Sequence, residues 1–524
     1  MVGKYVREAA EFSKFKNGEV LYLTIDDLPL TPAVAIVRID INRPMKGKEA
    51  PLADLRLRAH AETLRELSDK GWIVLVLAHQ GRPGKPDFVP LKNHARALSR
   101  LCGKKVIYPW SGSALSEVLP LGEKAVFNDR IEKMLKSLKP GDIFLFENTR
   151  FLKDEQATKS PEEHARHWFL QKLKGLFPDA VFVFDAFAAI HREHMSIIGP
   201  MTLWPTYAGR VLVNELEAIR GAIEKSEPER VLVCGGAKAD DSLKYVERLL
   251  KQGLIDKVLT CGVVGEIFLH AAGYSLNRAT LEFLKGLFDK ERAKSERIFS
   301  ECLADAENLL AAFGGKIVLP LGVAADVGGK RVEFKVDEKA CAKKGGVQLK
   351  LAFDAGSSAC PQFVPAFRNK KSGELIPEGA LIKDIDLRTA YFYVTTIMNA
   401  KTVIVNGPAG VYEEKEFRRG TRTLTRGLMR AADNEGLRTI VGGADIIAAM
   451  EASGVGMKHA WTISVGGKAF FDVATVGNIT GIPVIRALRD YTFRWHANRL
   501  SRMRALDRIA ANGSRTGEKT PTKI

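Results

Sequence analysis

The 524-residue sequence has only six cysteines and no long hydrophobic run. The cysteines are scattered, with no C-x-x-C pair and no histidine at ligand spacing. This pattern argues against a structural zinc site and for a reducing compartment. No apolar run approaches a membrane-spanning length, and residues 1–20 are too polar for a secretory signal. We therefore expect a cytoplasmic protein, and its length favours two domains.

Several motifs of well-known nucleotide-binding folds are also missing. The sequence has no G-x-x-x-x-G-K-[ST], which excludes a P-loop protein. No G-x-G-x-x-G follows the first expected strand, which argues against a nicotinamide-binding domain. The H-R-D and D-F-G elements of protein kinases are absent as well.

Basic residues outnumber acidic ones, 79 to 62, and give a net charge of +17. Such a balance suits either nucleic acid or small anionic substrates. No helix-turn-helix, zinc-finger spacing or RNP-like aromatic motif supports nucleic acid. The positions of the basic residues are therefore more informative than their number.

Four apolar runs in the first half of the chain end in polar and charged residues. They are AVAIVRIDINRP, WIVLVLAHQGRP, DIFLFENTRF and VFVFDAFAAIHR. Helical patterns such as LRLRAHAETLRELSDKG lie between them, which predicts a parallel sheet covered by helices. Because parallel strands end along one edge, their terminal arginines and histidine should converge there. Arginine forks suit carboxylate and phosphate oxygens, so we expect a small, multiply anionic ligand.

Apolar runs in the second half end in glycines instead. They are RVLVCGGAK, KVLTCGVVG, TVIVNGPAGVYEE, RTIVGGADI and WTISVGGKA. Glycine lets backbone amides approach a ligand closely, and helix N-termini favour phosphate oxygens. Repetition of this pattern favours a nucleotide-sized ligand.

These motifs together resemble the phosphoglycerate kinase family, with an archaeal-like, divergent character. The matching segments occur in the family's order: VRIDINRPM, HQGRPGKPDF, ENTRFLKDE, DAFAAIHREH, GGAKADDS, NGPAGVYEEKEFRRGT, IVGGADIIAAM and SVGGKA. The resemblance implies an α/β fold of two Rossmann-like lobes with parallel sheets, joined by a hinge helix.

The resemblance also implies a domain division. We expect an N-terminal phosphoglycerate-binding lobe at 1–207, completed by about 471–509, and a C-terminal nucleotide-binding lobe at 208–470. An insertion at about 331–379 is expected as a surface excursion, and 510–524 as a disordered tail.

Two helical patterns have open roles. The segment 208–225 has helical spacing and is either the hinge element or an ordinary packing helix. Residues 489–509 alternate arginines with apolar residues. They could bind RNA, an acidic partner or a membrane surface, but we favour a helix that packs on the N-terminal lobe.

The activity implied by the resemblance is reversible phosphoryl transfer, in glycolysis and gluconeogenesis. ATP and 3-phosphoglycerate would give ADP and 1,3-bisphosphoglycerate, with Mg²⁺ bound to the nucleotide and closure about a hinge, in a monomer. The implied acid-binding residues are Asp40, Asn42, Arg56, His79, Gln80, Gly81, Arg82, Arg150 and Arg192. The implied nucleotide-binding residues are Gly235, Gly236, Lys238, Gly262, Asn406, Glu413, Gly442, Gly443, Ala444 and Asp445.

The residue types fit this chemistry. The substrate carboxylate is already ionised, so the reaction needs charge neutralisation rather than a general base. We assign Arg56 and Lys238 as the catalytic contacts to the transferring group. Asp445 would hold the nucleotide-bound Mg²⁺, and Glu413 would bind the ribose hydroxyls.

Four positions depart from the family pattern. Ser242 replaces a frequent second lysine, for which Lys244 is a candidate substitute. Ala444 replaces a glycine, and Ile446 replaces a hydroxyl residue. Lys468 replaces a third glycine. Two other functions therefore stay open: a kinase of the same fold that acts on another small phosphorylated acid, and a catalytically weak scaffold or RNA-binding protein.

Overall fold

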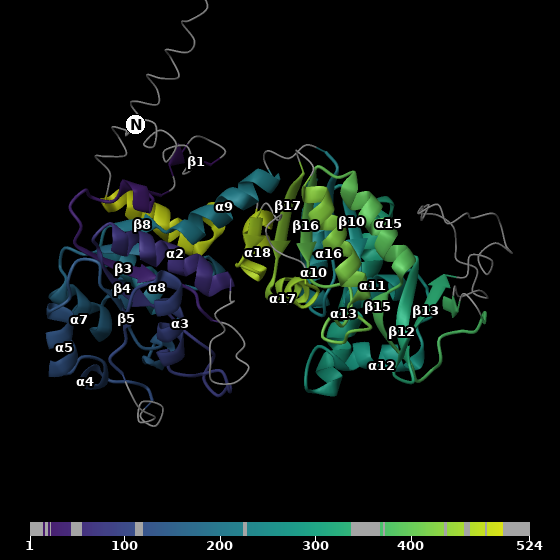
Figure 1. Ribbon diagram of the computed structural model, residues 1–524, viewed down its shortest axis with the longest axis horizontal. Coiled ribbons are helices and arrows are strands. Elements are labelled where there is room, and N and C mark those ends of the chain that lie inside the picture. Colours follow the sequence, from purple (N-terminus) through teal and green to yellow (C-terminus); the bar gives the residue numbers. More distant parts are fainter. Residues whose placement is uncertain are drawn as a thin grey trace, which may run out of the picture. The chain divides into compact units, whose positions relative to one another are not determined.

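In the computed structural model the chain divides into two compact units, Met1–Glu217 with Val476–Ile524 and Ala218–Thr475 (Figure 1). The division falls inside helix α9 (Arg210–Ile223), which confirms the helix predicted at 208–225. The structure describes residues 14–15, 19–20, 22–42, 55–110, 119–223, 228–336, 367–369, 372–433, 437–454, 462–476 and 479–495.

The first unit is built on a six-stranded sheet with the order β5-β6-β4-β3-β7-β8. All its strands run parallel. The four apolar runs of the sequence are the inner strands β6, β4, β3 and β7, so the predicted parallel sheet is confirmed. The strands are β3 (Val34–Arg38), β4 (Ile73–Leu77), β5 (Val106–Ile107), β6 (Ile143–Leu145), β7 (Val181–Phe184) and β8 (Thr206–Ala208).

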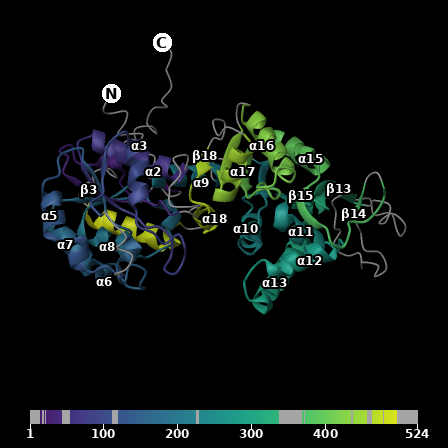
Figure 2. The same ribbon diagram turned by 60° about the horizontal axis from the view of Figure 1, so that its bottom comes forward.

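Helices cover both faces of this sheet, which explains why the strands are apolar throughout. In β7, Val181 and Val183 belong to a core shared with helices α2 (Leu55–Asp69) and α3 (Lys92–Cys102). Phe182 lies on the opposite face of the strand and is fully buried. Figure 2 shows α7 (Trp168–Leu176) across β3 from α2 and α3. Phe169 of α7 packs edge-on against Phe146, with the ring centroids 5.5 Å apart.

Short elements complete the first unit. They are β1 (Lys14–Phe15), β2 (Glu19–Val20), η1 (Ile25–Asp27), α4 (Glu123–Val126), α5 (Asp129–Lys136), η3 (Thr149–Phe151), α6 (Pro161–Ala165), η4 (Phe187–Ala189), α8 (Met195–Leu203) and η7 (Ile479–Gly481).

The second unit also has a six-stranded parallel sheet, with the order β11-β10-β9-β16-β17-β18. Its core on one face includes residues of α15, α16 and α17. The sheet strands are β9 (Arg230–Cys234), β10 (Lys257–Thr260), β11 (Ile317–Val318), β16 (Thr402–Asn406), β17 (Arg438–Gly442) and β18 (Thr462–Ser464). The helices are α10 (Ala239–Lys251), α11 (Gly262–Ala271), α12 (Arg278–Gly286), α13 (Arg292–Phe313), η5 (Gly314–Lys316), α15 (Leu387–Met398), α16 (Arg419–Ala432), α17 (Ala444–Ala452) and α18 (Lys468–Thr475).

A second, antiparallel sheet in this unit was not expected from the sequence. Its four strands have the order β14-β13-β12-β15. They are β12 (Gly322–Val327), β13 (Lys330–Val336), β14 (Phe367–Asn369) and β15 (Leu381–Ile385). Two of them lie within the 331–379 segment that we expected as a surface excursion, of which 337–366 and 370–371 lie outside the described residues.

The described part of the C-terminal tail packs on the first unit. Residues 483–495 are helical. The hydroxyl of Tyr491 donates to Glu162 at 2.5 Å, and the indole of Trp495 donates to the carbonyl of Met201 at 3.0 Å. Phe493 packs against the core of α2 and α3. The rest of the predicted 489–509 helix lies outside the described residues, as does the expected disordered tail at 510–524.

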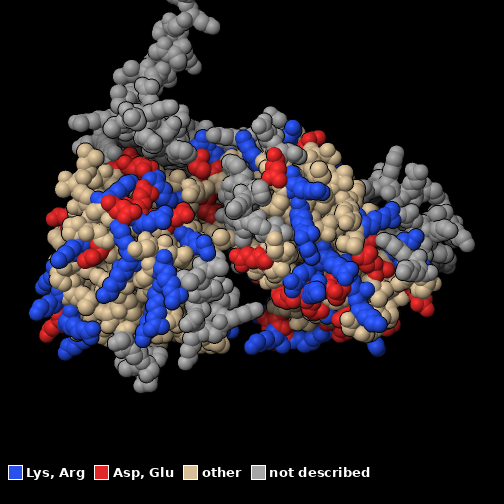
Figure 3. Space-filling view, in the orientation of Figure 1, with Lys and Arg blue, Asp and Glu red and all other residues tan. Residues whose placement is uncertain are grey.

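Charge is spread rather than concentrated. On the face shown in Figure 3, basic side chains cover described parts of both units and are interleaved with acidic ones. Among the described residues, no helix is both long and apolar enough to cross a bilayer. The described cysteines, Cys102, Cys234, Cys261 and Cys302, are buried free thiols.

Deletion of the chain after Leu488 should lower Tm, because it removes the contacts of Tyr491, Phe493 and Trp495 with the first unit. Binding to a generic RNA should be undetectable in both forms. Thermal unfolding and a fluorescence binding assay would measure the two properties. Salt-sensitive RNA binding that disappears on truncation would support the interaction role of the tail instead.

Candidate active site

Five arginines converge at the carboxyl edge of the first sheet. Arg38 ends β3, Arg56 begins α2, Arg82 follows β4, Arg150 lies in η3 after β6, and Arg192 follows β7. Burial and the charges of Arg192 and Arg38 lower the pKa of Arg150 to about 10. Burial also lowers the pKa of Arg192; Asp40 opposes this shift, while Arg82 and Arg56 add to it. The positive charges of these arginines repel one another, so binding of an anion among them is favourable.

His79 lies between two of these arginines and is almost fully buried. Its Nδ1 is 2.8 Å from Arg38 and its Nε2 is 3.1 Å from Arg192. Burial, followed by the charges of Arg38 and Arg150, holds the pKa of His79 well below its usual value. The ring is therefore neutral and accepts a hydrogen bond at only one nitrogen. Only one of the two arginines, Arg38 or Arg192, can therefore donate to the ring, and the other keeps its N–H groups for a ligand.

Asp40 fixes the position of Arg56. Its carboxylate accepts from Arg56 at 3.2 Å and from the amide of Asn42 at 2.9 Å. Burial alone would raise the pKa of Asp40, but Arg56, the Asn42 amide and Arg38 together hold it below its ordinary value. Arg56 also donates to the carbonyl of Asn42. The predicted catalytic arginine is thus held at the same edge as the other four.

Backbone contacts fix the loop after β4. The side-chain oxygen of Asn42 accepts from the amide of Gly81 at 2.8 Å, and Arg150 donates to the Gly81 carbonyl. Gly81 has φ +69°, and a Cβ there would lie 2.3 Å from the carbonyl oxygen of Asp87. Gln80 is fully buried, while Arg82 is exposed. Arg82 therefore contributes its positive charge to the arginine cluster without being buried in it.

Two buried supports of this site were missed by sequence reasoning. His60 of α2 accepts from the amide of Asp40 at 3.2 Å, so its other nitrogen carries the proton and donates to Asp185 at 2.9 Å. Asp185 also accepts from the amides of Val211 and Leu212 at the start of α9, at 2.8 and 3.3 Å. The acid that follows β7 thus connects the carboxyl edge of the first sheet to the first turn of α9.

A second support lies behind Arg38. Its Nε donates to the hydroxyl of Ser196 at 3.0 Å, and that hydroxyl donates to Glu155 at 2.6 Å. Arg38 and Glu155 are both at most 1% exposed. The strand-end position of Arg38 was visible in the sequence, but it was not among the residues assigned to the ligand.

In the second unit, several predicted glycines pack against one another instead of facing open space. The amide of Gly236 donates to the carbonyl of Pro408 at 2.8 Å, and that of Gly262 donates to Ala409 at 3.1 Å. A Cβ on Gly407 would lie 2.4 Å from the carbonyl oxygen of Gly235. Glycine is required here for contact between loops, and its expected role in nucleotide binding stays a prediction.

The loop after β17 is different. Gly443 has φ +108°, and the nearest atom to a Cβ there would be the side-chain oxygen of Asn406 at 3.8 Å. Gly442 likewise has only ordinary contacts, the nearest at 3.7 Å. Ala444 begins α17 directly after these glycines. The loop is therefore uncrowded at the Cβ positions of Gly442 and Gly443.

Lys238 and Asp445 lie beside each other. Their side-chain atoms are 3.2 Å apart, and the side chains are 76% and 57% exposed, so both can reach a ligand. Burial and the charges of Glu413 and Asp445 raise the pKa of Tyr412. The predicted phosphate and metal residues, Lys238 and Asp445, are therefore in contact, and Tyr412, next to the predicted ribose residue Glu413, lies within range of the charge of Asp445.

The donor set suits Mg²⁺ that arrives with a nucleotide. Within the described part of the chain, no group of three or more His, Cys, Asp or Glu residues could hold a metal ion. A single exposed carboxylate, Asp445, fits an ion whose other ligands are phosphate oxygens and waters.

The departures from the family pattern have different surroundings. Ser242 is buried, and its hydroxyl is 3.5 Å from Asn406. Lys244 is exposed in α10, and its expected role as a substitute for the missing lysine stays a prediction. Lys468 donates to Asp241 at 2.7 Å and to Tyr245 at 2.9 Å. Ile446 is 2% exposed and packs in the core.

Gly407→Ala should destabilise the second unit by about 2–5 kcal/mol, because the Cβ would meet backbone at φ +88°. Gly253→Ala is the matched control: φ is +64° there, but nothing lies within 4 Å of a Cβ. The control should cost only about 1–2 kcal/mol. Urea unfolding followed by circular dichroism would compare them, and equal losses would contradict the close packing of these loops.

Comparison with known proteins points to one family. A family model described as phosphoglycerate kinase matches residues 25–475. The phosphoglycerate kinase of Methanosarcina mazei is 33% identical over 467 residues, which cover 89% of this chain and 95% of that protein. That of Methanothermobacter thermautotrophicus is 33% identical over 474 residues, covering 90% and 97%.

Solved structures agree as well. The crystal structure of phosphoglycerate kinase from Pyrococcus horikoshii OT3 matches with a TM-score of 0.71 and 28% identity, covering 90% of this chain and 99% of that chain. That of phosphoglycerate kinase from Coxiella burnetii matches with a TM-score of 0.58 and 25% identity, covering 90% and 100%. The chain belongs to the phosphoglycerate kinase family.

Proposed function

We propose that the chain transfers a phosphoryl group reversibly between ATP and the carboxylate of 3-phosphoglycerate, as in glycolysis and gluconeogenesis. The observation that carries this proposal is the arginine cluster of the first unit. 3-Phosphoglycerate has a carboxylate and a phosphate, and two anionic groups are what several converging guanidinium groups bind best. In the second unit, the loop after β17 would complement it by binding the nucleotide phosphates.

The acid would be bound by residues of the first unit and the nucleotide by residues of the second. Arg150, Arg192 and His79 would hold the acid, and Arg56 would contact the group in transit. The amides beside Gly443 would meet phosphate oxygens, and Glu413 would bind the ribose. Asp445 would hold Mg²⁺ carried by the nucleotide, which supplies charge neutralisation of the phosphates.

The reaction needs no proton transfer. A carboxylate oxygen of the acid attacks the γ-phosphorus, the bond to the β–γ bridging oxygen breaks, and ADP leaves. Arg56 and Lys238 neutralise the charge on the transferring oxygens. Because the two substrates would bind to different units, we propose that the units close about α9, which also excludes water.

A coupled assay tests this function. ADP formation from MgATP would be followed with 3-phosphoglycerate and, separately, with 2-phosphoglycerate and glycerate. We expect turnover that depends on 3-phosphoglycerate and is much slower with the other acids. Faster turnover with another phosphorylated acid would favour the alternative kinase of the same fold, and no turnover with any acid would favour the scaffold.

A further inference from the structure

Both ends of the loop that carries Glu413 pack on one buried carboxylate. This loop, residues 410–420, follows β16 and includes the first two residues of α16. Asp384, in β15, has a fully buried side chain, and its carboxylate accepts from the amide of Gly420 at 2.8 Å. A Cβ on Gly410 or Gly420 would lie 2.5 or 2.2 Å from the same carboxylate. The two loop ends therefore close on Asp384 because each lacks a side chain.

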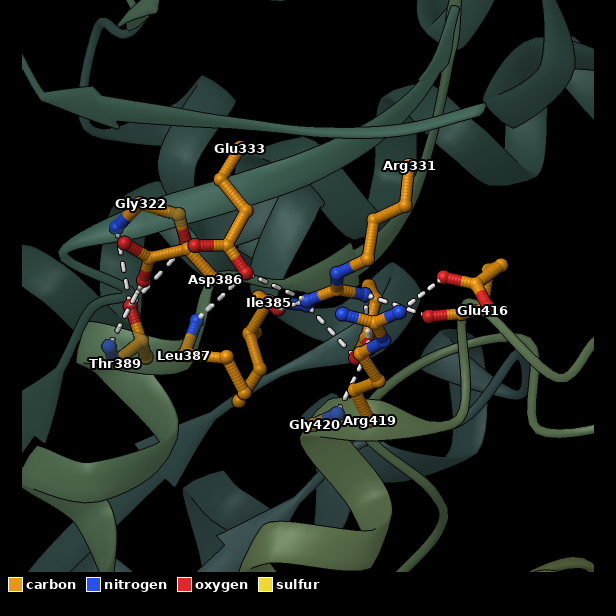
Figure 4. Close-up of polar contacts among 11 residues, drawn as sticks. Gly322, Arg331, Glu333, Ile385, Asp386, Leu387, Thr389, Glu416, Arg419 and Gly420 are labelled. Atoms are coloured by element: carbon orange, nitrogen blue, oxygen red, sulfur yellow. Dashed lines mark hydrogen bonds and ion pairs between the residues drawn. The ribbon is translucent and has the colours of Figure 1, made fainter. Parts of the chain in front are cut away.

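Arg331 holds Asp384 and the middle of the loop together. Its Nη1 donates to Asp384 at 2.7 Å and to the carbonyl of Glu416 at 3.2 Å. Its Nη2 donates to the carbonyl of Ile385 at 2.8 Å and to Glu333 at 3.2 Å. Figure 4 shows Arg331 among Glu333, Ile385 and Glu416. The Arg331 side chain is only 3% exposed. One guanidinium group thus connects two strands of the antiparallel sheet to the 410–420 loop.

Further contacts tie the same loop to β15. The amide of Val411 donates to the carbonyl of Lys383 at 2.8 Å. The ammonium group of Lys383 donates to Glu414 at 2.9 Å and to Asp326 of β12 at 2.8 Å. The loop is therefore attached to the antiparallel sheet on both sides of Glu413.

The opposite charges of Arg331 and Asp384 suit a structural support better than a separate binding site. Burial raises the pKa of Asp384 to about 6, and Arg331 and the amides of Gly420 and Ile385 oppose this rise. The carboxylate is therefore mostly ionised at neutral pH. A buried ion pair gives little net stability compared with apolar residues of the same size, so its contribution here lies in the geometry that its directed hydrogen bonds impose.

We propose that Arg331 and Asp384 are positioning residues for nucleotide binding, which hold the 410–420 loop so that Glu413 meets the nucleotide. This inference rests on the proposed role of Glu413. It gives the antiparallel sheet a function: the sheet is the rigid support of one side of the nucleotide site, and it acts through the loop without contacting the ligand.

The test compares Arg331→Met with Arg368→Met in the full chain. Arg368 lies in β14 of the same sheet, and its guanidinium donates to the carbonyl of Gly373 at 3.1 Å. We expect Arg331→Met to raise KM for MgATP about tenfold and to leave KM for 3-phosphoglycerate unchanged. Deuterium uptake by peptides covering 410–420 should increase. Arg368→Met should change none of these quantities.

Two more variants separate positioning from general stability. Arg331→Lys keeps the charge near Asp384 but loses the fork, so KM for MgATP should be partly restored. Glu413→Gln should raise KM for MgATP, and its effect should not add to that of Arg331→Met, because both act through one contact. If Arg331→Met does not fold, Asp384→Asn would be tested instead. The side-chain oxygen of the introduced asparagine can still accept from the amide of Gly420.

The outcomes distinguish a failure of the positioning proposal from a failure of the proposed role of Glu413. Increased loop exchange with no effect of Glu413→Gln on KM would refute the proposed role of Glu413, and the positioning proposal with it. A raised KM in Glu413→Gln with unchanged loop exchange in Arg331→Met would refute the positioning proposal alone. Equal rises in KM for both substrates in Arg331→Met would also overturn it, because they would indicate a general loss of structure.

Discussion

Lys238→Ala is expected to lower kcat by about two to three orders of magnitude while KM for ATP changes little. This size is typical for loss of one group that stabilises charge mainly in the transition state. Lys238 is 76% exposed and lies 3.2 Å from Asp445, so its ammonium group is available at the position where we place the phosphates. Single-turnover transfer from ATP would measure the effect without interference from product release.

Lys244→Ala is the matched control for this experiment. Lys244 is also exposed and lies in α10, which begins directly after Lys238. If it does not replace the lysine missing at Ser242, its replacement should leave kcat near that of the wild type, and the double variant should behave like Lys238→Ala. A loss of kcat in Lys244→Ala would show that it supplies that charge. Lys238→Arg should restore activity only in part, because a planar fork differs from a compact ammonium group. Wild-type turnover in the double variant would show that this loop does not face the transferring phosphate.

Arg150→Ala should raise KM for 3-phosphoglycerate by about one to two orders of magnitude and leave nucleotide affinity nearly unchanged. A charge-assisted contact of this kind is worth roughly 1.5–3 kcal/mol. Arg150 is 6% exposed, and four other arginines lie at the same sheet edge, so its loss removes charge where the acid is expected. Arg192→Ala, at a less buried position, should have a similar effect.

Steady-state kinetics with each substrate varied in turn would check this expectation. Arg130→Ala is a suitable control, because Arg130 is an exposed residue of α5 in the same unit. Circular dichroism would confirm that each variant is folded. Comparable losses of affinity for both substrates would contradict the assignment of the acid to the first unit and the nucleotide to the second.

The parallel sheets were predictable because their strands carry a strong signal. A strand buried on both faces must be apolar at every position, as β7 is, and its end must emerge at the carboxyl edge. The placement of Arg150 and Arg192 beside His79 follows from that rule alone. The helix at α2 was equally clear, since its apolar spacing ends at Gly71, where φ is +85°.

The antiparallel sheet had a signal that sequence reasoning did not use. Gly328 and Gly329, with φ of +59° and +79°, separate β12 from β13. Two consecutive glycines between apolar-rich runs favour a tight hairpin turn, because both positions need positive φ. Reading that pair as a hairpin would have shown that part of the 331–379 segment belongs to a sheet.

The buried polar pairs could not have been found in this way. His60 and Asp185 are 125 residues apart in the sequence, and Arg331 and Asp384 are 53 apart. Neither pair has a local pattern, because the partners meet only once the sheets have formed. The glycines show a related limit: Gly407 and Gly443 look alike in the sequence, yet only Gly443 has room beside it.

Hydrogen–deuterium exchange of the full chain with each substrate alone tests the central claim most directly. The claim is that the acid binds at the arginine edge of the first unit and the nucleotide at the loops of the second. 3-Phosphoglycerate should protect peptides that contain 79–82 and 149–151 and leave 406–445 unchanged. MgADP should do the reverse. Protection of the second unit by 3-phosphoglycerate, with none around Arg150, would contradict the account.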